Sequence, residues 1–408
     1  MTAAATSRTT ATTGTAGSAR APGSAGRLLG LDAARGVAVL GMMAVHALYT
    51  VTAEGAPTTT YLVAAGRSAA IFGVLAGVGI AFTTGRRRVR LRTQGRSAAA
   101  SLAARAAVVL VIGLALGWGS AEIAANILPY YGLMFLLAIP LVLLPTGALI
   151  GAATLVAAGV PLLSQWVRPG LPAPSLTNPT ITQLVTDPLG LLSELALTGY
   201  YPALPWLAYL AVGIAVGRLR LSETRVAGWL AGGGTALAVV ATLAARWAMG
   251  PLGGYAAIAA ATPPEQLASA PTVPGFVAVL PEGVTPTTTW WWLATDAPHS
   301  STPLDLAQTT GSALAVLGLL LLLGRLAHPL VQAVLRPLAA VGALTLSVYA
   351  VHIVFLNSPL DIFDAVPGYL VQVVVATLGA LAWRRAVGRG PLESLVRVVA
   401  RAARRAAA

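Results

Sequence analysis

The chain contains no cysteine among its 408 residues, its basic residues are all arginine, and only 10% of its residues are charged. The absence of cysteine excludes disulfides, a thiolate nucleophile, cysteine-ligated zinc and iron–sulfur clusters. The absence of lysine excludes a phosphate-binding loop of the Gly-x-x-x-x-Gly-Lys type. Soluble domains usually carry about 25% charged residues. The low charge, combined with 56% hydrophobic residues, therefore excludes an ordinary cytosolic enzyme.

Common metal and nucleophile motifs are also missing. The four histidines form neither His-x-x-x-His nor His-Glu-x-x-His, and the sequence has no aspartate-rich loop and no Gly-x-Ser-x-Gly. We therefore predict no metal site. The net charge of +13 comes from arginines in short loops and at the ends of apolar runs, and not from a basic soluble module. This pattern argues against nucleic acid as a partner.

The sequence does contain a series of apolar runs, each near the ~20 residues that a bilayer-crossing helix needs. We predict an all-α fold, a polytopic transmembrane helix bundle of about ten spans over residues 27–388. A disordered cytoplasmic tail over 1–26 and a basic cytoplasmic tail over 389–408 flank it. The ten runs lie at about 28–50, 63–84, 103–119, 126–144, 147–165, 201–218, 226–248, 306–324, 338–356 and 367–387.

The arginines predict the orientation of the bundle. If the N-terminus is cytoplasmic, 22 of the 26 arginines fall in cytoplasmic segments and only Arg168 and Arg246 fall in outer ones. Because cytoplasmic loops are enriched in arginine, we predict that both termini are cytoplasmic. The expected location is the cell (plasma) membrane.

Two outer segments, 166–200 and 249–305, are long and rich in proline and threonine. Loops of this length are more often functional than idle. Trp290, Trp291 and Trp292 are expected at the level of the lipid headgroups, as in an aromatic belt.

Two charged residues lie in the first apolar run. Each costs roughly 2.5–3.5 kcal/mol on the insertion scale, so each needs a reason to be there. Asp32 and Arg35 are three residues apart, so they share a helix face and can form an ion pair. Two interpretations stay open: the pair anchors the inner end of the helix, or it binds a ligand.

His46 follows Arg35 by eleven residues, which is about three helical turns. The two side chains therefore project from nearly the same face, ~16 Å apart along the axis. This geometry suits one long substrate between them, although a histidine at a helix end can also be a simple interfacial residue. A weak echo, Ala44-Val45-His46 against Ala350-Val351-His352, puts both histidines at outer helix ends. Other polar candidates are Arg67, Glu122, Asn126, His299 and His352.

The first apolar run carries a family resemblance. Residues 31–38 together with His46 are similar to the first transmembrane helix of a superfamily of integral-membrane acyltransferases. This superfamily includes the heparan-alpha-glucosaminide N-acetyltransferase catalytic domain, the bacterial YeiB-type proteins and the type-3 sugar O-acyltransferases. Type-3 proteins carry an arginine, ten residues and a histidine, and Arg35 and His46 match that spacing. Resemblance to the heparan-type and YeiB-type branch continues at 67–79, 130–137, 204–206, 336–342 and in Gly-Pro-Leu-Glu at 390–393.

This resemblance implies an acyl donor, usually acetyl-CoA from the cytoplasm, and an acceptor hydroxyl or amine that often lies outside. It implies a catalytic His46 and a donor-binding Arg35, and no permanently bound cofactor. Around them we predict that Asp32 orients Arg35 and that Asp32 and Arg67 join it in the donor-binding site. We also predict that Glu122 orients His46, and that Arg67 or Asn126 stabilises the oxyanion. Many YeiB-type proteins have asparagine in place of His46, and the long luminal domain of the heparan enzyme is absent here, so the acceptor stays open.

The expected partners are the lipid bilayer, acyl-CoA and a glycan or lipid acceptor, with no nucleic acid. The oligomeric state, a homodimer included, stays open. A rival interpretation is a transporter or exporter of a small molecule or lipid-linked sugar, because interrupted helices and buried charges are typical of that class too. The sequence shows no convincing inverted repeat, which counts against it.

Overall fold

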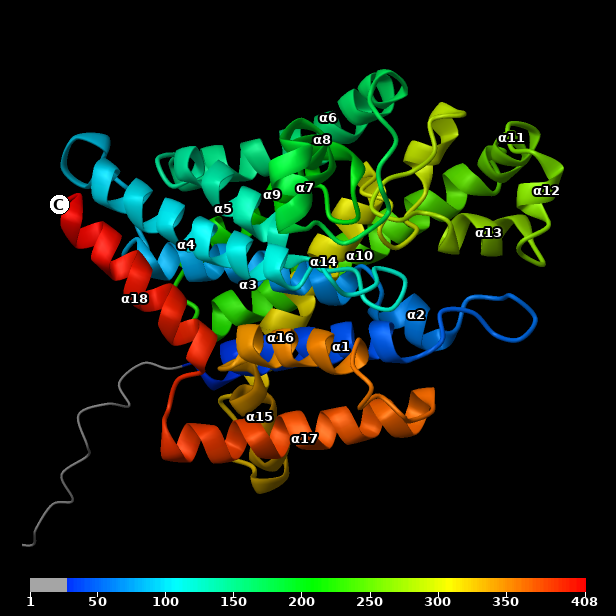
Figure 1. The fold of residues 1–408 in the computed structure, drawn as a ribbon. Coiled ribbons are helices and arrows are strands. Elements are labelled where there is room, and N and C mark those ends of the chain that lie inside the picture. The colour runs from blue at the N-terminus through cyan, green and yellow to red at the C-terminus, as the bar shows by residue number, and fades with distance from the viewer. Residues whose placement is uncertain (1–27) are drawn as a thin grey trace, which may run out of the picture.

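The computed structural model describes residues 28–408, and within them the regular structure is helical. One isolated β-bridge joins Val51 and Pro57, and the described residues form no strand. The predicted all-α class is confirmed. The expected tail over 1–26 lies outside the described residues. Figure 1 shows the long helices running broadly along one direction, with the C-terminus at one end of the bundle.

Seven helices of the described chain are long and apolar enough to cross a bilayer. Two further pairs are sharply bent, which raises the number to nine if each pair is one span. The chain is thus a multi-pass membrane protein, but ten spans are not confirmed, because the run at 126–144 forms only the 14-residue α5 (Leu128–Leu141). The seven are α1 (Leu29–Ala47), α2 and α3 (Thr59–Ala64, Arg67–Thr83), η1 and α4 (Leu91–Gly95, Arg96–Ala115), α6 and η2 (Thr146–Val167, Arg168–Gly170), α10 (Thr224–Met249), α14 (Pro303–Leu323) and α17 (Ala365–Ala386).

The run at 338–356, predicted as one span, is broken. It divides into α15 (Pro329–Gly342) and α16 (Thr345–Leu356), which meet at 75°. Gly342 ends α15 against α1, where a Cβ on this glycine would collide with the carbonyl oxygen of Asp32. Because the next amides, at the start of α16, bond to a side chain instead of α15 carbonyls, the helix can change direction here.

Small residues allow the long helices to pack closely. A Cβ on Gly234 of α10 would lie 2.6 Å from the carbonyl oxygen of Gly311 in α14. A Cβ on Gly311 would likewise lie 2.6 Å from the carbonyl oxygen of Gly234. Gly36 of α1 packs against the backbone of Leu338 in α15, so this glycine serves helix packing. Van der Waals contact between backbones is a main source of helix association in a bilayer.

The second bent pair joins the outer segment 166–200 to the bundle. This segment holds α7 (Ile181–Thr186), α8 (Pro188–Ser193) and the π-helical turn η3 (Glu194–Thr198). The last two meet α9 (Ala203–Arg218) at 54°, and α9 then runs through the centre of the bundle.

The outer segment 249–305 folds into a small unit with its own core. It contains α11 (Gly254–Ala260), α12 (Pro264–Leu267), α13 (Val273–Val279) and the 3-10 helix η4 (Trp290–Ala294). Trp292 is fully buried and packs with Met249, Ile258 and Phe276, and its indole N–H donates to Thr288 Oγ1 at 3.1 Å. Trp292 is therefore part of this core and not an exposed belt residue, whereas Trp290 is 57% exposed.

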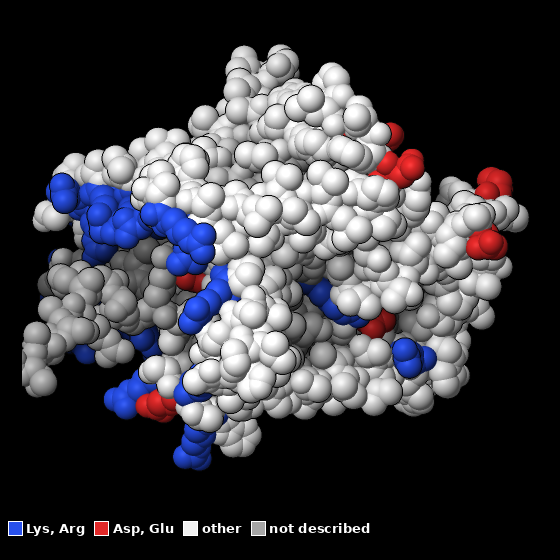
Figure 2. Space-filling model, turned by 90° about the horizontal axis from the view of Figure 1, so that it is seen from below, with Lys and Arg blue, Asp and Glu red and all other residues white. Residues whose placement is uncertain are grey.

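Charge separates along the bundle. The C-terminal residues fold into α18 (Pro391–Ala406), an arginine-rich helix that packs against α4, so the predicted basic tail is a structured part of the bundle. Figure 2 shows most of the visible arginines gathered at one end, and Figure 1 places α11, α12 and α13 at the opposite end. We call these the basic end and the outer end. The cytoplasmic place of the termini stays a prediction.

Candidate functional site

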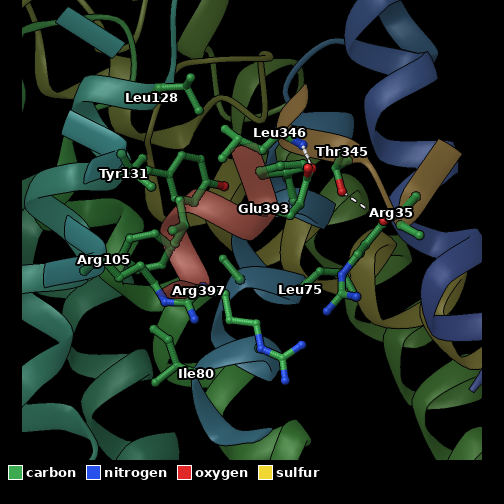
Figure 3. A pocket seen from close by; sticks show the side chains of 18 residues that line it. Arg35, Leu75, Ile80, Arg105, Leu128, Tyr131, Thr345, Leu346, Glu393 and Arg397 are labelled. Atoms are coloured by element: carbon green, nitrogen blue, oxygen red, sulfur yellow. Dashed lines mark hydrogen bonds between the residues drawn. The ribbon is translucent and has the colours of Figure 1, made fainter. Parts of the chain in front are cut away.

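A pocket of about 240 Å³ lies toward the basic end, among α1, α3, α4, α5, α16 and α18. We call it the arginine pocket, because Arg35, Arg105 and Arg397 line it together with Glu393. Figure 3 shows the three guanidinium groups on the same side of the pocket. They come from three different helices, so the fold gathers cations that are far apart in the sequence.

Arg35 holds the geometry that its spacing predicts. Its Nη1 donates to Asp32 Oδ1 at 3.0 Å, which confirms the ion pair within α1. Its other terminal nitrogen, Nη2, lies beside Gly79 of α3. A Cβ built on Gly79 would lie 4.0 Å from this nitrogen, so the space around it is open. The guanidinium is thus fixed by Asp32 and can still offer N–H donors to the pocket.

Arg105 and Arg397 were not among the predicted site residues. Neither makes a hydrogen bond or an ion pair with another described residue. Glu393 is occupied elsewhere: Oε1 accepts from the backbone N–H of Leu346 at 2.8 Å, and Oε2 accepts from Ser347 Oγ at 2.6 Å. The carboxylate therefore caps the broken helix α16 and leaves two cations of the pocket unpaired, which favours an anionic ligand.

The pocket is elongated. On α3 its lining runs from Phe72 to Ile80, which is ~12 Å along the helix axis. Gly79 lies beside Arg35, whereas Leu128 and Tyr131 lie away from the arginines and, with Phe72, form a more apolar end of the pocket (Figure 3). A ligand with an anionic head and a long, uncharged arm fits this division.

His46 pairs with another histidine. Its Nδ1 lies 3.1 Å from Nε2 of His352, and the rings are parallel within 8° at 5.3 Å. Nδ1 of His352 lies 2.6 Å from Oε1 of Gln372. An amide oxygen only accepts, so His352 Nδ1 must donate, and neutral His352 Nε2 then accepts from His46 Nδ1. This leaves the lone pair on Nε2 of His46 free to take a proton.

This histidine pair borders a second cavity, of about 80 Å³, at the other end of α1. His46 and Gln372 line it, together with two carboxylates from the loop before α17, Asp361 and Asp364. We call it the histidine pocket.

The two pockets share no lining residue. Tyr349 lies between them on α16, four residues after Thr345 of the arginine pocket and three before His352, so the three share one helix face. Its ring centre is 6.4 Å from that of His46, and its hydroxyl accepts from the backbone N–H of Ile127 at 3.1 Å.

Arg67, predicted to bind the donor or to stabilise an oxyanion, is not brought to Arg35. It begins α3 at the outer end and donates to the carbonyl of Leu62. Gly79, which contacts Arg35, is twelve residues farther along the same helix, or ~18 Å.

Glu122 and Asn126 are also not placed as predicted. Glu122 is exposed on the turn before α5, and the hydrogen-bond partner of His46 is His352 instead. Asn126 is buried, and its side chain donates to the carbonyl of Gly113 at 2.8 Å and accepts from the N–H of Leu128 at 3.1 Å. Its amide is thus used to hold the outer turn.

His299 has a structural position. Its Nε2 accepts from the backbone N–H of Gly66 at 3.2 Å, and its ring meets Tyr201 edge-on at 5.7 Å. Burial lowers the pKa of His299 to about 4. The ring is therefore neutral and braces the turn that precedes α3.

The sequence contains signals for some of the site residues that the sequence analysis did not assign to the site. The repeated Ala-Val-His tripeptide contains His352, and the Gly-Pro-Leu-Glu motif contains Glu393. In the sequence, Arg105 and Arg397 count only among the arginines that predict the orientation. Gln372 had no signal, because one glutamine in an apolar helix does not reveal its partner. The described residues hold no cluster of three or more potential metal ligands.

Comparison with known families finds a match over the N-terminal part of the chain. The family described as "Heparan-alpha-glucosaminide N-acetyltransferase, catalytic" matches residues 27–249, which is more than half of the chain. The matched part contains Arg35, His46, Arg105 and Tyr131. No curated protein matches the chain.

Proposed function

Because the chain belongs to the heparan-alpha-glucosaminide N-acetyltransferase catalytic family, we propose that it is a plasma-membrane acyltransferase that uses acetyl-CoA. The acceptor is a hydroxyl or an amine of an envelope glycan or lipid. One observation carries the proposal: Arg35 and His46 of a single helix line two different pockets, one basic and one with a free imidazole lone pair.

The arginine pocket supplies the donor site. Guanidinium groups bind phosphate oxygens through paired, charge-assisted hydrogen bonds. Arg35, Arg105 and Arg397 would hold the phosphates of acetyl-CoA, with Asp32 orienting Arg35. The uncharged arm of the donor would extend along the ~12 Å of the pocket toward Tyr131.

The histidine pair supplies the base. Nε2 of His46 takes the proton of the acceptor, whose oxygen or nitrogen attacks the thioester carbonyl. The carbon–sulfur bond breaks, and the CoA sulfur leaves with the proton returned by His46. In a two-step variant, Nε2 itself attacks the thioester carbonyl and the CoA thiolate leaves. The acceptor then attacks the acyl-imidazole, the carbon–nitrogen bond breaks, and the proton of the acceptor passes to the CoA thiolate. Both routes require the pockets to join, and Tyr349 beside the break between α15 and α16 is where they would do so.

The test measures thiol release from acetyl-CoA by purified protein in detergent. Because the chain has no cysteine, a thiol-reactive dye reports only the released CoA. We expect Arg35→Ala to weaken acetyl-CoA binding by about 10- to 100-fold, the worth of a lost hydrogen bond to a charged group. Arg35→Lys should rescue only part, because lysine lacks the bidentate fork.

Arg225→Ala is the matched control, since this arginine is exposed at the basic end outside the pocket. It should bind acetyl-CoA normally. A folded Arg35→Ala protein with normal donor affinity would refute the donor site.

A transporter or exporter is the second candidate, favoured by the break between α15 and α16. Broken helices whose half-helix ends face a polar pocket are typical of transporter binding sites. Thiol release separates the two, because a transporter moves its substrate without cleaving acetyl-CoA.

A further inference from the structure

Tyr131 has a hydroxyl that no other residue of the described range 28–408 uses. Its side chain is only 2% exposed and lines the apolar end of the arginine pocket. Among the described residues its oxygen has no hydrogen-bond partner. Figure 3 shows the hydroxyl pointing into the pocket, toward the space beside Leu346 and Glu393.

The orientation of this hydroxyl is fixed by packing. The ring of Tyr131 meets Phe72 edge-on at 5.5 Å and Phe135 at 5.9 Å. Gly73 of α3 leaves room beside the oxygen, where a Cβ would lie 3.5 Å away. The ring therefore cannot easily turn the hydroxyl toward another protein group.

The neighbouring buried tyrosines differ from Tyr131. The hydroxyl of Tyr130 accepts from the backbone N–H of Tyr200 at 3.1 Å, and that of Tyr209 bonds to Thr309 Oγ1 at 2.7 Å. Buried polar groups are nearly always hydrogen-bonded, and an unpaired one lowers the free energy of unfolding. An unpaired hydroxyl aimed into a pocket therefore points to a partner supplied by the ligand.

We propose that the Tyr131 hydroxyl donates a hydrogen bond to a carbonyl oxygen of the bound acyl donor. This inference rests on the proposed function and assigns Tyr131 as a donor-binding residue. The arginines hold the anionic head, so the group that reaches Tyr131 belongs to the uncharged arm. That arm offers two kinds of carbonyl, the acyl thioester and the amides.

The test replaces Tyr131 by phenylalanine and measures the affinities for acetyl-CoA and for CoA by calorimetry in detergent. We expect the affinity for acetyl-CoA to fall by about 5- to 10-fold, the worth of one hydrogen bond. If the thioester is the partner, CoA binding is unchanged. If an amide is the partner, both affinities fall. The melting temperature should stay the same or rise, because Tyr131→Phe removes only an unpaired hydroxyl.

Tyr130→Phe is the matched control on the adjacent residue. It removes a hydroxyl that already has a partner, so it should lower the melting temperature and leave both affinities unchanged. Wild-type affinities for both ligands in Tyr131→Phe would overturn the proposal, whatever the melting temperature. Failure of the proposed function looks different, since wild-type protein would then not bind acetyl-CoA at all.

Discussion

The chemistry of His46 depends on a side chain it does not touch. Gln372 accepts from His352 Nδ1 at 2.6 Å, and this fixes which nitrogen of each ring carries a proton. Gln372 thus sets the tautomer of His352, and His352 in turn sets the tautomer of His46. In a hydrolase, a carboxylate sets the tautomer of the catalytic base in the same way. The side-chain amide of Gln372 in α17 therefore determines that Nε2 of His46 in α1 keeps a free lone pair.

Replacing His46 by asparagine should separate catalysis from binding. Asparagine cannot accept a proton near neutral pH, so thiol release should fall by roughly 10²–10⁴, the usual worth of general acid–base assistance. Donor affinity should hold, because Arg35 lies ~16 Å away along α1. The exposed His328 offers a control, and His328→Asn should release thiol at the wild-type rate. Full turnover in His46→Asn would remove His46 from the mechanism.

His299 makes stability depend on pH. Its pKa falls from 6.5 to about 4 on folding, so between these values the unfolded chain binds the extra proton. The stabilisation is complete above pH 6.5 and is lost as pH falls toward 4, by up to about 3 kcal/mol. His299→Gln keeps an acceptor for Gly66 and should flatten the melting temperature between pH 4.5 and 6.5. An unchanged pH profile in that variant would contradict the assignment.

The element that most shapes the site is α16. Its first amides lack α15 carbonyls and bond to Glu393 of α18 instead. The last helix of the chain therefore holds the start of the broken span and also supplies Arg397 to the pocket. The carboxylate of Glu393 therefore links the position of the break between α15 and α16 to the shape of the arginine pocket.

Removing this carboxylate should destabilise the protein. Glu393→Ala leaves the N–H groups of Leu346 and Ser347 without a partner, which should cost about 1.5–3 kcal/mol for hydrogen bonds to a charged group. The readout is the melting temperature in detergent. Glu223→Ala removes only the exposed pair with Arg220 and should change it little. Equal melting temperatures in the two variants would rule out the capping role.

Local features of the site could be read from the sequence, and long-range ones could not. The Asp32–Arg35 pair follows from helical spacing alone, and most apolar runs became helices at nearly the predicted bounds. His46 and His352 are 306 residues apart, and Glu393 lies 47 residues from Leu346. Periodicity fixes which residues share a helix face, but only tertiary packing decides which faces meet.

The misplaced residues show the same limit. The sequence predicts Arg67, Glu122 and Asn126 in the site because they are polar and near helix ends. The structure uses the Asn126 amide in a turn and keeps Arg67 at the outer end of a straight helix. Trp292 looked like a belt residue because of its neighbours, yet it fills the small core of the outer segment.

Across the whole molecule, the arginine asymmetry predicts sidedness. Most of the arginines visible in Figure 2 lie at the basic end, so a reporter fused at residue 222 should behave as cytoplasmic and one at residue 280 as external. The measurement compares the activities of the two reporter fusions, at residues 222 and 280, in intact cells. A cytoplasmic signal at residue 280 would reverse the orientation and put the arginine pocket outside.

The most direct measurement of the central claim uses proteoliposomes in which acetyl-CoA with a labelled acetyl group is supplied only on the side of the basic end. An extract of envelope glycans and lipids is supplied on the side of the outer end. The proposed function predicts release of one CoA thiol for each labelled acetyl group that appears in the extract, and almost none with His46→Asn. Intact acetyl-CoA and an unlabelled extract, from wild-type protein that binds the donor, would contradict it.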